Sequence, residues 1–63
     1  MPDDKNLNTT TLIAYWQMGR QSEAINCPFE AKRYYEEGVN FAMLHAPQNK
    51  LLRNLDEALA RIN

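Results

Sequence analysis

The sequence predicts an all-α protein, a small three-helix fold that combines a helical hairpin with a C-terminal amphipathic helix. Its apolar residues recur at intervals of three and four and almost never alternate, which favours helices over strands. Two prolines, Pro28 and Pro47, divide this pattern into three segments. The chain has only 63 residues, so a single domain is the upper limit.

The first helix is expected after a polar N-terminal arm, residues 1–8. The run from Asn8 to Thr11 offers several N-caps, and the helix that follows places Leu12 and Trp16 on one face. Gly19 either ends this helix or lets another helix approach closely, and residues 22–25 either continue the helix or form a turn. Residues 9–63 then form one helical domain.

The second and third helices have clearer boundaries. Proline is well placed in a first helical turn and restricts the residue before it, so Pro28 predicts a helix start with Cys27 at or near the N-cap. This helix runs to about His45, because Pro47 ends or bends it. Asn49 can cap the third helix. Its apolar residues share one face: Leu51, Leu52, Leu55, Ala58, Leu59 and Ile62.

This apolar face of the third helix needs a partner. Burying each large apolar side chain contributes about 1.5–3 kcal/mol, so the face should not remain in water. The helix packs either on the first two helices or on a second copy of the chain, and the pattern fits both. In a homodimer, the self-association residues would be Leu51, Leu52, Leu55, Leu59 and Ile62.

The charge balance limits the partners. Seven Lys and Arg residues stand against eight Asp and Glu residues, a net charge of −1, which excludes an unassisted nucleic-acid clamp. Arg20, Lys32 and Arg33 lie near the junction of the first two helices, where they predict at most weak, salt-sensitive RNA contact. Most of the aromatic residues should lie in the core, with one or two at a partner surface.

No set of side chains points to catalysis. Cys27 and His45 fall at opposite ends of the second predicted helix, roughly 27 Å apart. One cysteine and one histidine cannot supply the four protein ligands of a structural zinc site. The two glycines are isolated, so no phosphate-binding loop is visible. We therefore expect no enzymatic activity, no metal and no cofactor.

The N-terminal residues are polar and acidic, without the apolar stretch of a secretory signal, and no run approaches the length of a membrane span. A single cysteine allows no intrachain disulfide. These observations predict a cytoplasmic protein that makes no membrane contact.

One motif carries a family resemblance. Cys27-Pro28-Phe29 is followed by Lys32, Tyr35, Gly38 and Ala42, at successive offsets of three, three and four, after a first segment that contains Gly19. This stretch resembles the ribosome modulation factor family, in which a glycine-bearing helix precedes Cys-Pro-Tyr and a helix with Arg, Trp, Gly and Ala.

The resemblance implies a non-enzymatic protein that docks onto the ribosome or another large assembly. In such a module Arg20, Lys32 and Arg33 would meet phosphates or acidic groups, and an exposed Phe29 or Tyr35 would provide an anchor. The alternative is a protein–protein inhibitor or adaptor of the kind that phages and mobile elements encode, which self-associates through its leucine-rich C-terminal helix.

Overall fold

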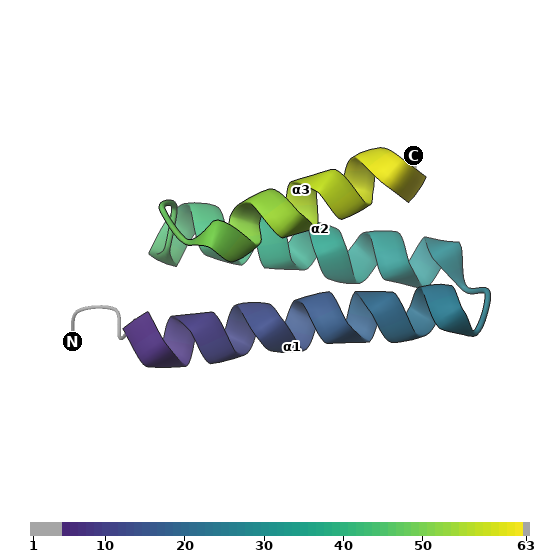
Figure 1. Ribbon diagram of the computed structural model, residues 1–63, viewed down its shortest axis with the longest axis horizontal. Coiled ribbons are helices and arrows are strands. Elements are labelled where there is room, and N and C mark those ends of the chain that lie inside the picture. Colours follow the sequence, from purple (N-terminus) through teal and green to yellow (C-terminus); the bar gives the residue numbers. More distant parts are fainter. Residues whose placement is uncertain (1–4, 63) are drawn as a thin grey trace.

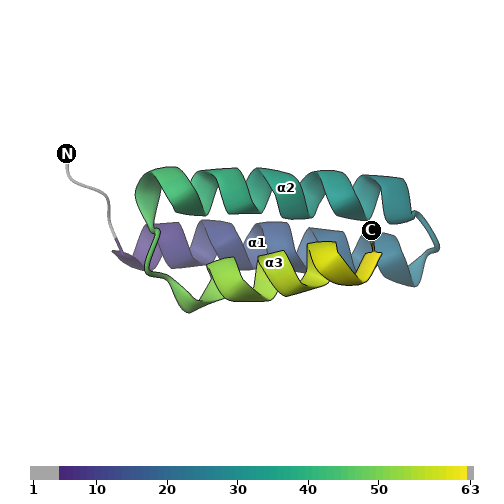
Figure 2. The same cartoon turned by 90° about the horizontal axis from the view of Figure 1, so that it is seen from above.

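The computed structural model describes residues 5–62 and consists of three α-helices (Figure 1). They are α1 (Lys5–Ala24), α2 (Pro28–His45) and α3 (Lys50–Ile62). The described part of the chain contains no strand, so the predicted all-α class is confirmed. α1 and α2 form an antiparallel hairpin, and α3 returns along one side of it (Figures 1 and 2).

α1 begins at Lys5, before the expected start at residue 9, so residues 5–8 of the expected polar arm are helical. The rest of the arm lies outside the described residues. The hydroxyls of Thr10 and Thr11 donate to the carbonyls four residues earlier, at 2.9 and 3.0 Å, which threonine does inside a helix. Asn8 is buried, and its amide donates to the carbonyl of His45 at 3.3 Å. These side chains therefore act within the helix and at its contact with α2.

The turn between α1 and α2 is closed by a left-handed residue. Asn26 has φ 64°, and its N–H donates to the carbonyl of Glu23 at 3.0 Å. The N–H of Cys27 donates to the carbonyl of Ser22 at 2.7 Å, which completes the hydrogen-bond pattern of a Schellman motif. The turn places Cys27 at the N-cap and Pro28 at the start of α2, as predicted.

The core is narrow because many of its residues are small. Its largest fully buried side chains are Leu12, Tyr35 and Leu55, with alanines between them. A β-carbon added at Gly19 would lie 2.7 Å from the Cδ1 and Cζ atoms of Tyr35, and one at Gly38 would lie 2.9 Å from Cδ1 of Leu55. Of the two roles open to Gly19, the structure shows close approach, since α1 continues to Ala24.

α3 buries its apolar face on the chain's own core. The side-chain Oδ1 of Asn49 accepts the N–H of Leu51 at 2.9 Å, which confirms the predicted cap. Leu55 is fully buried. The other residues named for self-association are half-buried against the same core: Leu51, Leu52, Leu59 and Ile62. Of the two alternatives for this face, packing on the first two helices is the one that the structure shows.

Candidate binding surface

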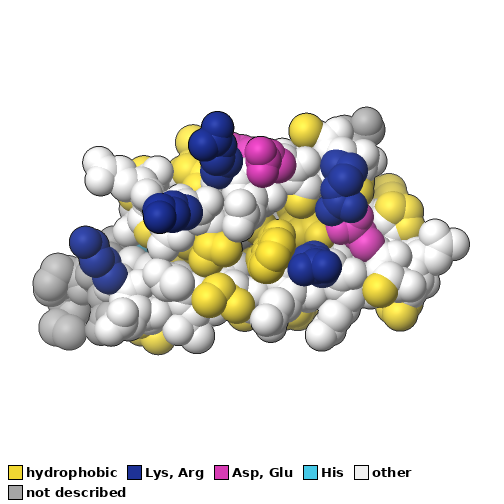
Figure 3. Space-filling view, viewed as in Figure 1, with side chains coloured by type: hydrophobic (Ala, Val, Ile, Leu, Met, Phe, Trp, Pro, Cys, Tyr) yellow, Lys and Arg dark blue, Asp and Glu magenta, His cyan; other side chains and the backbone are white. Residues whose placement is uncertain are grey.

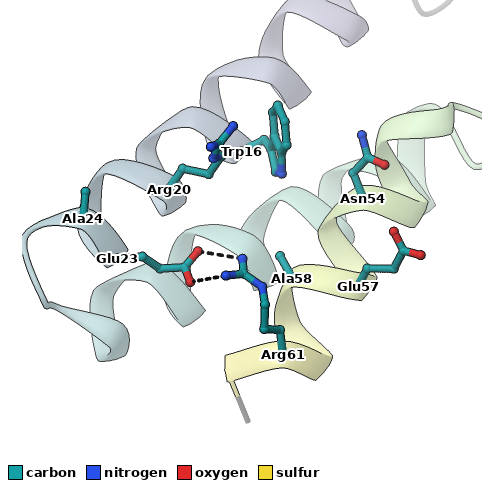
Figure 4. Close-up of a pocket in the computed structure, with 8 residues that line it drawn as sticks. All are labelled: Trp16, Arg20, Glu23, Ala24, Asn54, Glu57, Ala58 and Arg61. Carbon is teal, nitrogen blue, oxygen red and sulfur yellow. Dashed lines mark hydrogen bonds and ion pairs between the residues drawn. The ribbon is translucent and has the colours of Figure 1, made fainter.

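An open hollow of about 620 Å³ lies between the C-terminal halves of α1 and α3. Figure 4 shows its lining. α1 contributes Trp16, Arg20, Glu23 and Ala24, and α3 contributes Asn54, Glu57, Ala58 and Arg61. Charged, amide and aromatic groups from two helices therefore face one depression.

The carboxylate of Glu23 joins all three helices beside this hollow. It accepts a hydrogen bond from the hydroxyl of Tyr35 in α2. Arg61 in α3 donates from Nη2 to Oε2 of Glu23 at 3.0 Å, and its Nη1 lies 3.0 Å from Oε1 (Figure 4). The Glu23 side chain is 20% exposed, so the ion pair is only partly in water. This paired geometry fixes the last turn of α3 against α1.

The same contacts set the protonation states of the two acidic groups. The Tyr35 hydrogen bond, with smaller contributions from Arg61 and Arg20, holds the pKa of Glu23 below its usual 4.5 although burial acts in the opposite direction. Burial and the neighbouring Glu23 raise the pKa of Tyr35 to about 12. At neutral pH Glu23 is ionised and Tyr35 is protonated, the forms that make these contacts.

Arg20 and Trp16 form a second contact in the hollow. The guanidinium carbon of Arg20 lies 5.1 Å from the centroid of the Trp16 ring, within the range of a cation–π interaction. Trp16 is half-buried, and Arg20 is exposed. The pair presents a planar cation above an aromatic ring, an arrangement suited to anionic or aromatic groups.

A second hollow of about 710 Å³ lies at the other end of the molecule, where α1 starts and α3 begins. Lys5 and Lys50 both line it and are exposed. Inside it, the amide of Asn49 donates to the hydroxyl of Thr9 at 3.0 Å. The α1–α3 seam is therefore held by polar contacts near both ends.

Lysine and arginine are more numerous on the two helices of this seam than on α2. α2 carries only Lys32 and Arg33, whereas α1 and α3 carry the other five: Lys5, Arg20, Lys50, Arg53 and Arg61. Figure 3 shows dark-blue side chains distributed along the α1–α3 face. The same two helices carry three carboxylates, Glu23, Asp56 and Glu57, and Arg61 holds the first of them. We call the surface formed by these five cations and Trp16 the α1–α3 face. It is cationic although the chain's net charge is −1.

The partner-binding residues predicted from the sequence do not form one surface. Tyr35 is fully buried, so the expectation that it could be an exposed anchor is wrong. Its ring packs on Gly19 and its hydroxyl binds Glu23. The aromatic spacing of α2 does not reveal this, because the covering glycine lies on another helix.

Phe29 does match its expectation of exposure, with 89% of its surface accessible. It lines a shallow depression with Lys32, Arg33 and Ile62 at the start of α2. Arg33 also pairs with Glu37 at 3.6 Å, as the spacing predicts. Arg20 instead faces α3, so the three predicted cations divide between two surfaces.

Sequence reasoning missed the roles of Trp16, Glu23 and Arg61. The spacing of four between Glu57 and Arg61 favours a local ion pair, but Arg61 binds Glu23, which is 38 residues away. No local pattern signals such a pair. The spacing of four between Trp16 and Arg20 was the one local signal for this hollow.

The structure keeps the nucleophile and base candidates apart. Cys27 precedes α2 and His45 ends it. Within residues 5–62, no group of three or more His, Cys, Asp or Glu side chains is arranged to hold a metal ion. Over the same residues, no helix combines the length and the apolar character that crossing a membrane requires.

A comparison with protein-family models finds no match to this chain, and comparisons with curated proteins and with solved structures find none either. The resemblance of residues 19–42 to the ribosome modulation factor family therefore stays a prediction from the motif.

Proposed function

We propose that the chain is a non-enzymatic binding module that docks onto the ribosome and places its α1–α3 face against ribosomal RNA. The excess of basic residues on α1 and α3 carries this proposal, since these two helices hold five Lys and Arg residues against three Asp and Glu residues. α2 carries two Lys and Arg residues against three acidic ones, Glu30, Glu36 and Glu37. A slightly acidic chain can therefore still offer one cationic surface to phosphates.

The chemistry of the α1–α3 face suits RNA. Arginine and lysine neutralise phosphates, and aromatic rings stack on unpaired bases. Arg20 lies over Trp16, so one position combines a cation with a half-buried ring. Arg61 is held in place by Glu23 before any partner binds. The module would act by covering its docking site, without turnover.

Co-sedimentation with ribosomes tests the proposal. The double variant Lys50→Glu/Arg53→Glu should bind at least about tenfold more weakly than the wild type, because phosphate contacts carry the binding. The matched control is Lys32→Glu/Arg33→Glu, which makes the same charge change on α2 and should bind like the wild type. Binding should also weaken as salt rises. Absence of co-sedimentation at low salt would contradict the ribosomal proposal.

Phe29 favours a second candidate, a protein–protein adaptor. An aromatic side chain that is 89% exposed beside Lys32 and Arg33 is typical of an interface anchor. The same assay separates the candidates. Loss of binding in Phe29→Ala, with normal binding by Lys50→Glu/Arg53→Glu, would place docking at the start of α2.

A further inference from the structure

The side of the α1–α2 hairpin that faces away from α3 carries two regular rows of residues, of which the row on α1 is uncharged. α3 lies along only one side of the hairpin (Figures 1 and 2). On the other side, α1 and the turn directly after it have residues spaced by four, three, four, three and four: Leu7, Thr11, Ala14, Met18 and Gln21 in the helix and Ile25 in the turn. α2 contributes a row with the same spacing: Glu30, Tyr34, Glu37, Phe41 and Leu44. We call these two rows the outer face.

The contacts of these residues confirm that α3 does not cover the outer face. A depression of about 400 Å³ is lined by Met18, Ile25 and Tyr34 and by neighbouring residues of α1, with none from α3. Farther along, the rings of Tyr15 and Phe41 lie 6.4 Å apart. Phe41 in turn lies 4.7 Å from the ring of His45. Apolar and aromatic groups thus extend along the hairpin.

The spacing on α1 is that of a helix with two packing seams. Alternating steps of four and three keep a seam facing one partner helix, as in coiled coils. The inner seam of α1, which includes Leu12 and Gly19, packs on α2. The outer seam has the same period and is exposed at Leu7, Met18 and Ile25.

The core of one chain leaves much apolar surface in water. In the described part of the chain three large side chains are fully buried, whereas seven large hydrophobic side chains are exposed. Four of those seven lie on the outer face: Leu7, Met18, Ile25 and Leu44. Small domains bury the least surface per residue and commonly gain stability by association.

We propose that a second copy of this chain packs on the outer face, in a two-fold dimer that places α1 of each copy on α2 of the other. The charge pattern selects this pairing. The outer row of α1 has no charged residue, so it can face Glu30 and Glu37 of the other copy without repulsion. Pairing α2 with α2 would instead bring Glu30 and Glu37 of both copies together, with one cation per copy, Arg33, beside them.

The size and chemistry of the outer face fit a copy of the same chain. The molecule measures 38 × 17 × 14 Å. A side of 38 × 14 Å covers on the order of 500 Å² per copy, and two such sides give about 1,000 Å², the size of a weak specific interface. A two-fold interface joins identical patches, so the uncharged α1 row of each copy would meet the α2 row of the other.

The oligomeric state of the full chain tests this proposal. Sedimentation equilibrium up to about 1 mM should give the mass of two chains for the wild type. Met18→Glu should raise the dissociation constant at least about tenfold, because it places a charge at the centre of the outer face. Met18 is 42% exposed, so the single chain should keep its helices, which circular dichroism checks.

Met43→Glu is the matched control. Met43 is 64% exposed and follows Val39 by one turn, on the side of α2 away from Tyr34 and Phe41, so this variant should remain dimeric. Ala14→Glu is a second variant that places a charge on the outer face. Glutamate is a good helix former, so the single chain should keep its helices and the dimer should dissociate as it does in Met18→Glu.

Two results would overturn the proposal. If the wild type has the mass of one chain at the highest concentration, the outer face does not bind a second copy. The occupant would then be a different apolar partner. Dissociation that Met43→Glu causes as strongly as Met18→Glu and Ala14→Glu would show that the interface lies elsewhere.

Discussion

The contacts of α2 and the seam between α1 and α3 are built in different ways. α2 approaches its neighbours closely because glycines lie where Tyr35 and Leu55 pack. The seam instead depends on the polar contacts of Glu23 and Asn49, with open hollows along it. Close apolar packing thus makes α2 the central helix, while polar contacts orient α3 and leave the seam's side chains accessible.

The largest effect is expected from Leu55→Ala. Leu55 is fully buried, so truncation should lower the free energy of unfolding by about 3 kcal/mol, through lost burial and a cavity. Urea unfolding at one protein concentration measures it. Met43→Ala is the control, because Met43 is 64% exposed, lies outside the outer face and should change stability by less than about 0.5 kcal/mol. Equal losses in both variants would contradict the buried role of Leu55.

The second largest effect is expected from Gly19→Ala, which should lower the free energy of unfolding by about 2 kcal/mol through overpacking. The added methyl would overlap the buried ring of Tyr35, which its hydrogen bond to Glu23 also holds in place. Gly38→Ala is the comparison. Its β-carbon meets the methyl end of Leu55 at 2.9 Å and should be tolerated better. If thermal melting ranks the two variants in the opposite order, the close approach at Gly19 is wrong.

Asn49→Ala tests the first polar contact of the seam and should lower stability by about 1 kcal/mol, mainly because the cap of α3 is lost. Thr9→Val removes only the acceptor of the Asn49 amide and keeps the cap, so it should have a smaller effect. Chemical denaturation of both variants separates the cap from the seam. A larger loss in Thr9→Val would reverse this assignment.

The smallest effect is expected from protonation of Glu23. Its pKa is lower in the folded chain than the usual 4.5, so its stabilising contribution is present above 4.5 and is lost as the pH falls through the folded value. The loss should be below about 1 kcal/mol. Glu23→Gln should remove this part of the acid dependence, whereas Glu57→Gln should preserve it.

Nuclear magnetic resonance titration of the Glu23 carboxyl provides a direct measurement. In Tyr35→Phe its pKa should rise toward 4.5, because the Tyr35 hydrogen bond is the main cause of the lowered value. An unchanged pKa in this variant would mean that the hydrogen bond contributes little.

The fold was predictable where local signals mark the helix ends. Pro28 sets the start of α2 through its backbone geometry, and Asn49 caps α3 through its own side chain. The start of α1 was missed because Thr10 and Thr11 can either cap a helix or bond backward within it. That choice depends on Asn8 reaching the end of α2, a contact across 37 residues.

The candidate site was predictable only in part. The sequence indicates Arg20 as a cation for a partner, but half of the hollow that it lines comes from α3. The burial of Tyr35 depends on Gly19 in another helix, and Glu23 pairs with Arg61 across 38 residues. Periodicity shows which residues share a helix face, whereas tertiary contacts decide which faces are covered.

Trp16 is the chain's single tryptophan and lies at the seam between α1 and α3, so tryptophan fluorescence reports on this seam alone. Its fluorescence depends on how α3 shields the ring, while far-ultraviolet dichroism follows the total helix content. If α3 separates before the hairpin unfolds, emission will shift to longer wavelength at a lower denaturant concentration than the dichroism changes. Coincident curves would instead show that the three helices unfold as one cooperative unit.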